Sequence, residues 1–334
     1  MKKFTNTILL FFIICVSTLN SQTNFDEEFK SFWDSTIVEL NKIPKNIRKL
    51  NEEQHNGKLL SLYRINSWNN IDFHIYVSEP INKGKYETRI KFSPFGKQDY
   101  TFDEVTKDYF MRQDSLICVK VDNRGQGLSR DEISNDRFIL NGIGNKENYV
   151  YRGVFMDVYR SVNFISSHSK SNGVIVATGG SQGGMLALVA SALNSEIDVA
   201  IVRIPFFAGI NKYNKENRWP MRWILNTSEN ERGISKEEQL KQLSYYDVKN
   251  FAKFIDIPVF IGSCENDPIT PYEAILEAFT NIKNKDKMIY VVSDCYTHGY
   301  KSEIEQQISK LFLELNLKKI YEQKTIQDKE TKKE

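Results

Sequence analysis

The segment Gly179-Gly180-Ser181-Gln182-Gly183-Gly184 lies between two stretches of different character. The short apolar run Val174–Ala177 before it predicts a buried strand, and residues 185–193 after it predict a helix. Strand, Gly-x-Ser-x-Gly and helix together indicate a nucleophile elbow, in which glycines permit the tight turn that exposes the serine hydroxyl. The segment lacks the lysine of a phosphate loop and the Gly-x-Gly-x-x-Gly spacing of a dinucleotide loop. We therefore expect Ser181 to be a nucleophile.

A serine hydroxyl is a weak nucleophile until a base takes its proton, so an acid and a histidine should follow along the chain. Asp267 comes soon after a strand predicted at Pro258–Gly262, and His298 comes soon after one predicted at Lys287–Val292. The order serine, aspartate, histidine, with each residue after a strand, is that of the α/β-hydrolase fold. Ser181, Asp267 and His298 are therefore the predicted catalytic triad.

Two other carboxylates occur in the same predicted loops. Glu265 and Asp294 are alternatives for the acid and rank below Asp267. Taken singly, Asp267 could be a helix cap ahead of Pro271, and His298 could be a surface residue. Their joint position after consecutive strands favours the triad.

The oxyanion of an acyl-transfer intermediate needs two backbone donors. One comes from the residue after the nucleophile, which is Gln182. The other comes from the loop after an earlier strand, which here reads Ser93-Pro94-Phe95-Gly96. Because proline has no N–H, Phe95 is the predicted second donor, although its ring could also simply pack.

Short apolar runs separated by helical stretches recur from residue 89 onward. This alternation predicts an α/β fold with a mainly parallel central sheet flanked by helices, and with functional groups at the carboxyl ends of the strands. An antiparallel pair precedes it at Leu59–Ile65 and Ile71–Val77. The polar and aromatic stretch 205–250 is expected to form a helical cap insertion. The remaining predicted strands are Ile90–Phe92, Leu116–Val121, Val174–Ala177 and Val199–Val202.

The 334 residues fit one large domain with insertions. Basic and acidic residues number 45 and 43, so no charge excess indicates nucleic acid. Met1-Lys2-Lys3 followed by the apolar run Ile8–Val16 reads as an export signal, and the run is too short for a stable membrane anchor. We expect a signal peptide at 1–21, the domain at 22–320, a frayed charged tail at 321–334, and a periplasmic or extracellular location.

Three cysteines follow the predicted signal peptide: Cys118, Cys264 and Cys295. Cys264 and Cys295 end two predicted strands, so a bridge is conceivable, but a chain of this size does not need one, and buried free thiols are the expectation. Neither these cysteines nor the scattered histidines have the spacing of metal ligands. We expect no metal and no cofactor.

Three segments carry a resemblance to a known family: Asp122–Gly127 with its Arg-Gly-Gln, Gly179–Gly184, and Thr297-His298. From about residue 30 to residue 318 the chain resembles the acetyl xylan esterase and cephalosporin C deacetylase family. Tyr149–Asp157 and Ser244–Ala252 also look like segments of that family. The resemblance implies deacetylation of short-chain esters on sugars or cephalosporins by the triad above, and often a homo-oligomer. It also implies structural roles for Arg124 and Gln126.

The chain departs from that family at two positions. The family usually has glutamate after the histidine, where this chain has Gly299, and its oxyanion loop typically carries His-Gly-Tyr, where this chain has Ser93-Pro94-Phe95. Two other functions are therefore kept as alternatives. One is a different hydrolase on the same fold, such as an exopeptidase or a lactonase, and the other is a catalytically inactive carbohydrate-binding relative.

Overall fold

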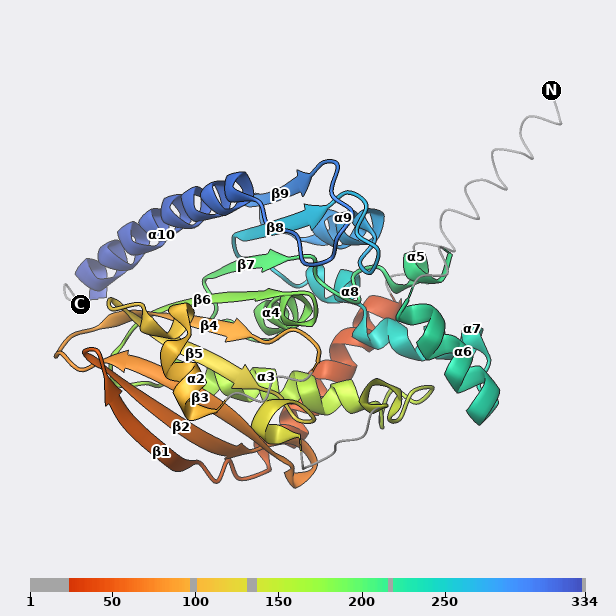
Figure 1. The fold of residues 1–334 in the computed structure, drawn as a ribbon, viewed down its shortest axis with the longest axis horizontal. Coiled ribbons are helices and arrows are strands. Elements are labelled where there is room, and N and C mark those ends of the chain that lie inside the picture. The colour runs from red at the N-terminus through yellow and green to blue at the C-terminus, as the bar shows by residue number, and fades with distance from the viewer. Residues whose placement is uncertain (1–23, 97–100, 131–136, 216–218, 332–334) are drawn as a thin grey trace. The chain divides into compact units, whose positions relative to one another are not determined.

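A computed structural model describes residues 24–96, 101–130, 137–215 and 219–331 (Figure 1). The predicted export signal lies outside these residues. Two compact units divide the chain between Lys42 and Ile43. In the first, residues 24–41 are helical, and the rings of Phe32 and Trp33 meet edge to face with their centroids 5.0 Å apart. Within the described ranges, no helix has the length and apolar character needed to cross a membrane.

The second unit is built on a nine-stranded sheet of order β1-β2-β3-β5-β4-β6-β7-β8-β9. The pairs β1–β2, β2–β3 and β3–β5 are antiparallel, and the five pairs from β5–β4 to β8–β9 are parallel. This arrangement confirms the predicted mainly parallel sheet and the antiparallel pair before it. The strands are β1 Arg48–His55, β2 Lys58–Asn66, β3 Asp72–Pro80, β4 Tyr86–Phe92, β5 Leu116–Asp122, β6 Ser171–Gly180, β7 Val199–Arg203, β8 Val259–Cys264 and β9 Lys287–Val292.

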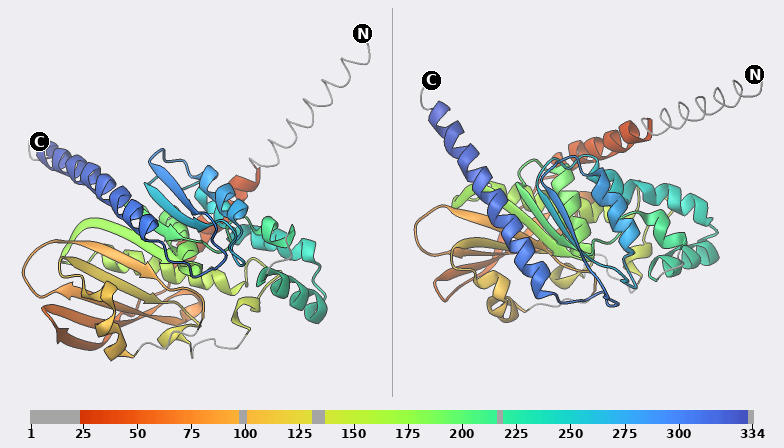
Figure 2. Two further views of the ribbon diagram at one scale, coloured as in Figure 1. Left: turned by 45° about the horizontal axis from the view of Figure 1, so that its top comes forward. Right: turned by 90° about the horizontal axis from the view of Figure 1, so that it is seen from above.

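Helices connect the parallel strands, as crossover connections require. The α-helices are α2 Phe102–Lys107, α3 Val150–Ser166, α4 Gln182–Leu193, α5 Ile210–Lys215, α6 Met221–Arg232, α7 Lys236–Leu243, α8 Val248–Ala252, α9 Tyr272–Asn281 and α10 Glu303–Thr331. Short 3-10 helices are η1 Trp68–Asn70, η2 Tyr109–Arg112, η3 Gly127–Ser129, η4 Phe138–Leu140 and η5 Ser244–Tyr246. Figure 2 shows α10 running across the sheet.

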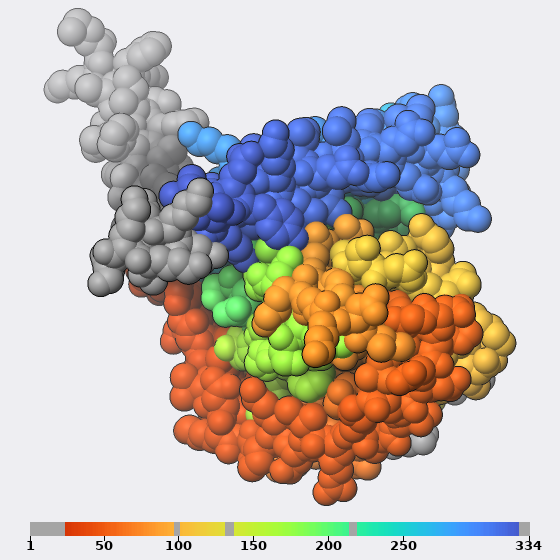
Figure 3. Space-filling model, turned by 90° about the vertical axis from the view of Figure 1, so that its left-hand side faces the viewer, coloured from red at the N-terminus to blue at the C-terminus, as the bar shows by residue number. Residues whose placement is uncertain are grey.

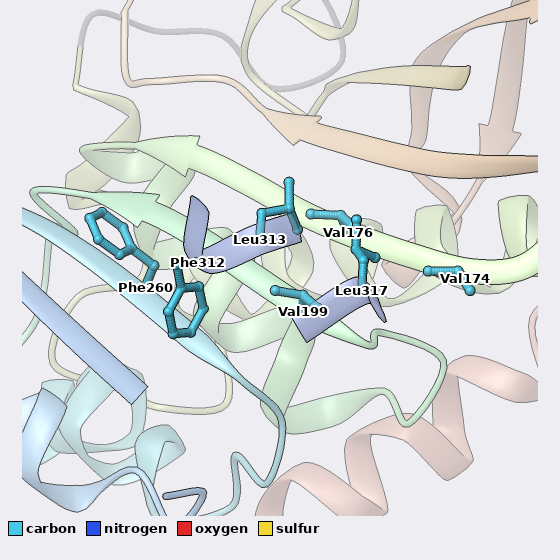
Figure 4. Close-up of a cluster of buried hydrophobic side chains, with 7 residues drawn as sticks. All are labelled: Val174, Val176, Val199, Phe260, Phe312, Leu313 and Leu317. Atoms are coloured by element: carbon cyan, nitrogen blue, oxygen red, sulfur yellow. The ribbon is translucent and has the colours of Figure 1, made fainter. Parts of the chain in front are cut away.

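Three side chains of α10 anchor it on the sheet. Phe312, Leu313 and Leu317 of this helix form one buried cluster with side chains of β6, β7 and β8 (Figure 4). Elsewhere, η2 and α2 place Met111 and Val105 in a second cluster with residues of β2, β3 and β5. Because side chains alternate along a strand, these clusters use one face of the sheet, and the opposite face packs against α3 and α4.

Strand β1 was not predicted, because its sequence lacks the usual apolar pattern. All eight residues of Arg48–His55 are exposed, and most of them are charged or amide residues. The strand forms because its backbone pairs with β2, and its charged side chains suit an edge that must not pair further.

The segment between β7 and β8 contains α5, α6, α7, η5 and α8, so residues 205–250 are largely helical. Their role as a cap stays a prediction.

At the other end of the chain, α10 continues to Thr331, where the charged sequence suggested a frayed tail. The anchored first half of α10 explains the difference, because a helix that has already nucleated extends readily through good helix formers such as lysine, glutamate and glutamine.

Candidate active site

Ser181 lies at the sharp turn between β6 and α4, with φ 54° and ψ −122°. A residue other than glycine in such a conformation is strained, and strain of this kind is concentrated at functional sites. The neighbouring glycines leave room for the turn. A Cβ atom on Gly183 would overlap the carbonyl oxygen of Phe92, and one on Gly179 would overlap the backbone of Gly183. This is the turn that the Gly-x-Ser-x-Gly motif predicts.

The structure joins the three predicted triad residues in one hydrogen-bonded chain. His298 Nε2 lies 2.8 Å from Ser181 Oγ, and His298 Nδ1 lies 2.9 Å from Asp267 Oδ2. Asp267 follows β8 and is fully buried, whereas His298 follows β9 and keeps about a fifth of its side chain exposed. A partly exposed imidazole between a serine and a buried carboxylate can take a proton from the serine and return it to a leaving group.

Backbone groups hold the Asp267 carboxylate in place. Its Oδ1 accepts hydrogen bonds from the N–H groups of Ile269 at 2.7 Å and Thr270 at 2.9 Å. Burial acts to raise the pKa of Asp267, but the hydrogen bonds from His298, Thr270 and Ile269 outweigh it and lower the pKa below its ordinary value. Asp267 is therefore ionised at neutral pH and can stabilise a charged imidazole.

The two alternative acids lie elsewhere in these loops. Glu265 Oε2 accepts the N–H of Asp294 at 3.2 Å, and both side chains are exposed. In the described part of the chain, no hydrogen bond joins either carboxylate to His298. The geometry thus favours Asp267 as the acid.

The two predicted oxyanion donors belong to adjacent segments. Gln182 begins α4, where helix N–H groups lack an acceptor within the helix, and the close approach of Gly183 to Phe92 brings the end of β4 against this helix start. Phe95 lies three residues beyond Phe92 and is half exposed. A groove of about 520 Å³ is lined by Ser93 and Pro94 together with Ser181 and His298. The donor roles of Gln182 and Phe95 stay predictions.

The buried Gln182 side chain has partners that the motifs did not reveal. Its Oε1 accepts hydrogen bonds from Tyr151 Oη at 2.7 Å and from Gln126 Nε2 at 3.2 Å, and its Nε2 donates to Ser93 O at 3.4 Å. Gln182 thus ties the nucleophile turn to α3, to the Arg-Gly-Gln segment and to the loop after β4. Tyr151 and Gln126 both lie in segments that carried the family resemblance. That resemblance was the sign in the sequence that could have pointed to them as partners of Gln182.

A family model described as acetyl xylan esterase (AXE1) matches residues 14–315. The chain belongs to this acetyl xylan esterase family. Acetyl esterase Axe7A of Xylanibacter ruminicola is 23% identical over 271 residues, which are 76% of this chain and 59% of that protein. The chain therefore spans less than two thirds of the length of this curated relative.

Two solved structures of acetyl xylan esterases share the fold. Acetyl xylan esterase 1 from Thermoanaerobacterium sp. JW/SL YS485 superposes with a TM-score of 0.76 at 21% identity, covering 86% of this chain and 94% of that one. The acetyl xylan esterase from Paenibacillus sp. R4 superposes with a TM-score of 0.73 at 21% identity, covering 85% and 93%. The chain thus has the α/β-hydrolase fold of acetyl xylan esterases.

This acetyl xylan esterase family member contains a disulfide between Cys264 and Cys295, with their Cα atoms 5.4 Å apart. The expectation of free thiols at these positions was wrong. Both cysteines are buried, and pairing of the parallel strands β8 and β9 brings their carboxyl ends together, which a reading of chain size cannot reveal. Cys118 is buried and free. The disulfide joins the loop that carries Asp267 to the loop that carries His298.

We expect removal of this disulfide to destabilise the fold. The bond closes a loop with a sequence separation of 31, for which chain entropy gives a stabilisation of about 3–4 kcal/mol. The double variant Cys264→Ala/Cys295→Ala should lose a comparable free energy of unfolding in urea. Added reductant should lower the free energy of unfolding of the wild type but not that of this variant. If wild type and variant unfold at the same urea concentration, the disulfide does not stabilise the protein.

Arg124 of the Arg-Gly-Gln segment forms a fully buried ion pair with Asp157 of α3. Its Nε and Nη2 donate to the two carboxylate oxygens at 2.8 and 2.6 Å, and its Nη1 donates to Trp68 O at 3.0 Å. Only 2% of the Arg124 side chain and none of the Asp157 side chain is exposed. The guanidinium also occupies the space that a Cβ atom on Gly153 would need. The structural role that the resemblance implied for Arg124 thus has a specific partner.

Breaking this pair should cost far more stability than breaking an exposed one. Arg124→Met leaves the Asp157 carboxylate buried without its counterion, so we expect the free energy of unfolding to fall by about 3–5 kcal/mol. The matched control is Arg137→Met, which removes an exposed pair with Glu231 and should change the free energy of unfolding little, because solvent screens such a pair. Urea denaturation measures both. Equal losses would show that the burial of the Arg124 pair has no consequence.

Proposed function

We propose that this chain is a serine esterase that hydrolyses short-chain esters of saccharides, acetyl esters above all, through an acyl-enzyme. The hydrogen-bonded chain from Asp267 through His298 to Ser181 carries the proposal, because it brings a nucleophile, a base and an orienting acid from three loops together. Membership of the acetyl xylan esterase family supports the acetyl group and the saccharide. Cephalosporin-like acetates remain alternative substrates.

In the first half of the reaction, His298 Nε2 takes the proton from Ser181 Oγ as the oxygen attacks the ester carbonyl. The N–H groups of Gln182 and Phe95 stabilise the negative oxygen of the tetrahedral intermediate. The intermediate collapses, and His298 returns the proton to the departing alcohol. The saccharide hydroxyl leaves, and the acetyl group stays on Ser181.

In the second half, a water molecule replaces the alcohol. His298 takes a proton from the water as it attacks the acetyl carbon, and then returns a proton to Ser181 Oγ when acetic acid departs, which ionises to acetate in solution. The ionised Asp267 keeps the Nδ1 proton of His298 in place throughout, so that Nε2 is free to accept. These residues complete the cycle without a cofactor.

The test is hydrolysis of three substrates by the purified protein: an acetylated xylo-oligosaccharide, p-nitrophenyl butyrate and an aminoacyl anilide. We expect acetate release from the saccharide, slower hydrolysis of the butyrate and no cleavage of the anilide. Anilide cleavage without acetate release would instead indicate an exopeptidase. A fluorophosphonate probe that fails to label Ser181 in the folded protein would indicate an inactive relative.

We also propose that residues 1–21 direct export to the periplasm or beyond. The positive start and the short apolar run support this proposal. Cleavage near Gln22 would be detected by mass spectrometry of the protein recovered from an exporting host. Recovery of the intact N-terminus in the cytoplasm would contradict it.

A further inference from the structure

Strand β4 lies at the centre of the sheet and yet has a polar face. It is fifth of the nine strands, and parallel strands that are covered on both sides normally read as continuous apolar runs. In β4, the apolar residues Ile90 and Phe92 are buried, whereas Arg89 and Lys91, which alternate with them, are partly exposed. One face of the central strand is therefore polar and only partly covered.

The two apolar clusters on this face of the sheet lie on either side of β4. Helix α10 covers Val174 and Val176 of β6, and α2 with η2 covers Cys118 of β5. The next residues along these strands on the same face are Thr178 and Lys120, which are the register partners of Lys91. Figure 3 shows a hollow between the blue C-terminal part of the chain and the yellow segment around residues 101–130.

This hollow continues into the proposed active site. The groove that contains Ser181 and His298 is also lined by Lys91, Lys120 and Thr178, with Gln306 of α10 beside them. Because Thr178 precedes Ser181 by three residues, the polar strip lies about 10 Å from the nucleophile along the strand. A substrate with its ester at Ser181 can therefore extend over Lys91.

The carboxylates near the groove pair with cations other than Lys91. Lys120 Nζ pairs with Asp108 at 3.1 Å, and Arg203 pairs with Glu305 at 2.9 Å. Within the described ranges, Lys91 Nζ forms no ion pair. It makes a cation–π contact with the ring of Phe110, 5.3 Å from the ring centroid. Two further acidic groups on this face are also engaged: Glu87 pairs with Arg89, and Asp122 accepts the N–H of Leu128.

Burial lowers the pKa of Lys91 from its ordinary value, and Lys120 adds to this effect while Asp108 opposes it. A half-buried ammonium of this kind gains more from an anion than a solvated one does, because less water screens the interaction. Lysine acts toward an anion as a point charge and accepts carboxylate and sulfate alike.

We propose that the groove over β4 is an anion subsite for an acidic substituent on the alcohol part of the ester. The ammonium group of Lys91 binds that substituent. The polar lining from Thr178 and Gln306 suits a saccharide, and a uronic acid branch would supply the anion. This inference rests on the proposed function, because it gives that function a substrate class: acetylated saccharides that carry a carboxylate away from the acetyl group.

The test compares two substrates that differ only in charge: an acetylated xylo-oligosaccharide with a glucuronic acid branch, and the same compound with that branch reduced to glucose. We expect wild type to prefer the acidic compound by about tenfold in kcat/KM, and 0.5 M salt to reduce this preference. Lys91→Gln should bring the ratio near one, whereas Lys91→Arg should retain most of it. The matched control Lys83→Gln removes an exposed charge in the β3–β4 turn and should keep the wild-type ratio.

A wild-type ratio near one, or an unchanged ratio in Lys91→Gln, would overturn the subsite. A third acetylated compound with a sulfate ester on the branch shows whether the site takes any anion or a carboxylate alone.

Calorimetry with Ser181→Ala and the deacetylated acidic compound separates the two proposals. If the acidic compound binds Ser181→Ala/Lys91→Gln more weakly than Ser181→Ala, and wild type hydrolyses neither ester, the subsite stands and the proposed esterase function is wrong. If wild type hydrolyses both esters at the same rate, the esterase function stands and the subsite is wrong.

Discussion

Replacing Ser181 with alanine is expected to lower kcat for acetate esters by about 10⁶-fold, the scale found when a serine nucleophile that acts within a triad is removed. The acyl-enzyme cannot form without Oγ, and His298 then has no nucleophile to activate. Residual hydrolysis would come from binding and from the oxyanion donors alone. Acetate release from acetylated xylo-oligosaccharides measures the loss.

The matched control is Ser191→Ala in the same helix. Ser191 Oγ donates to Ala187 O within α4, and Ser191 is not among the residues that line the groove, so activity should stay near that of wild type. Circular dichroism should show that both variants are folded. Equal acetate release by wild type and Ser181→Ala would reject the central proposal.

Several parallel strands could be predicted from the sequence because their central residues form short apolar runs that are buried in the sheet. Val174–Ala177 lies within β6, and Leu116–Val121 lies within β5. Strand β1 could not be predicted in this way, because pairing with β2, not burial of its side chains, determines its structure. The same limit applies to the Cys264–Cys295 disulfide, since proximity of two strand ends depends on strand order rather than on the local sequence.

The proximity of Ser181, Asp267 and His298 could be predicted, because the order of these residues and their placement after strands are visible in the sequence. The groups that hold them in place could not. Two backbone N–H donors fix Asp267, and Tyr151 fixes Gln182 from another helix. The groove over β4 was also hidden, although the alternation Ile90-Lys91-Phe92 on a central strand was a visible sign of it.

Asp267→Asn is expected to lower kcat by about 10⁴-fold while leaving the protein folded. The asparagine oxygen can still accept the N–H groups of Ile269 and Thr270, so the loop keeps its hydrogen bonds. Its amide can, however, donate to His298 Nδ1, which a carboxylate cannot do. The imidazole proton would then reside on Nε2, where it faces Ser181 and prevents His298 from acting as a base.

The matched control for the acid is Asp294→Asn, because Asp294 precedes His298 by four residues and is exposed. Its carboxylate makes no hydrogen bond with His298 in the described part of the chain, so kcat should change less than twofold. Steady-state kinetics on p-nitrophenyl acetate compare the two variants, and thermal unfolding confirms that each is folded. A larger loss in Asp294→Asn than in Asp267→Asn would transfer the role of the acid to Asp294. The geometry argues against that outcome, because Asp267 is buried, accepts two backbone N–H groups and lies 2.9 Å from His298 Nδ1.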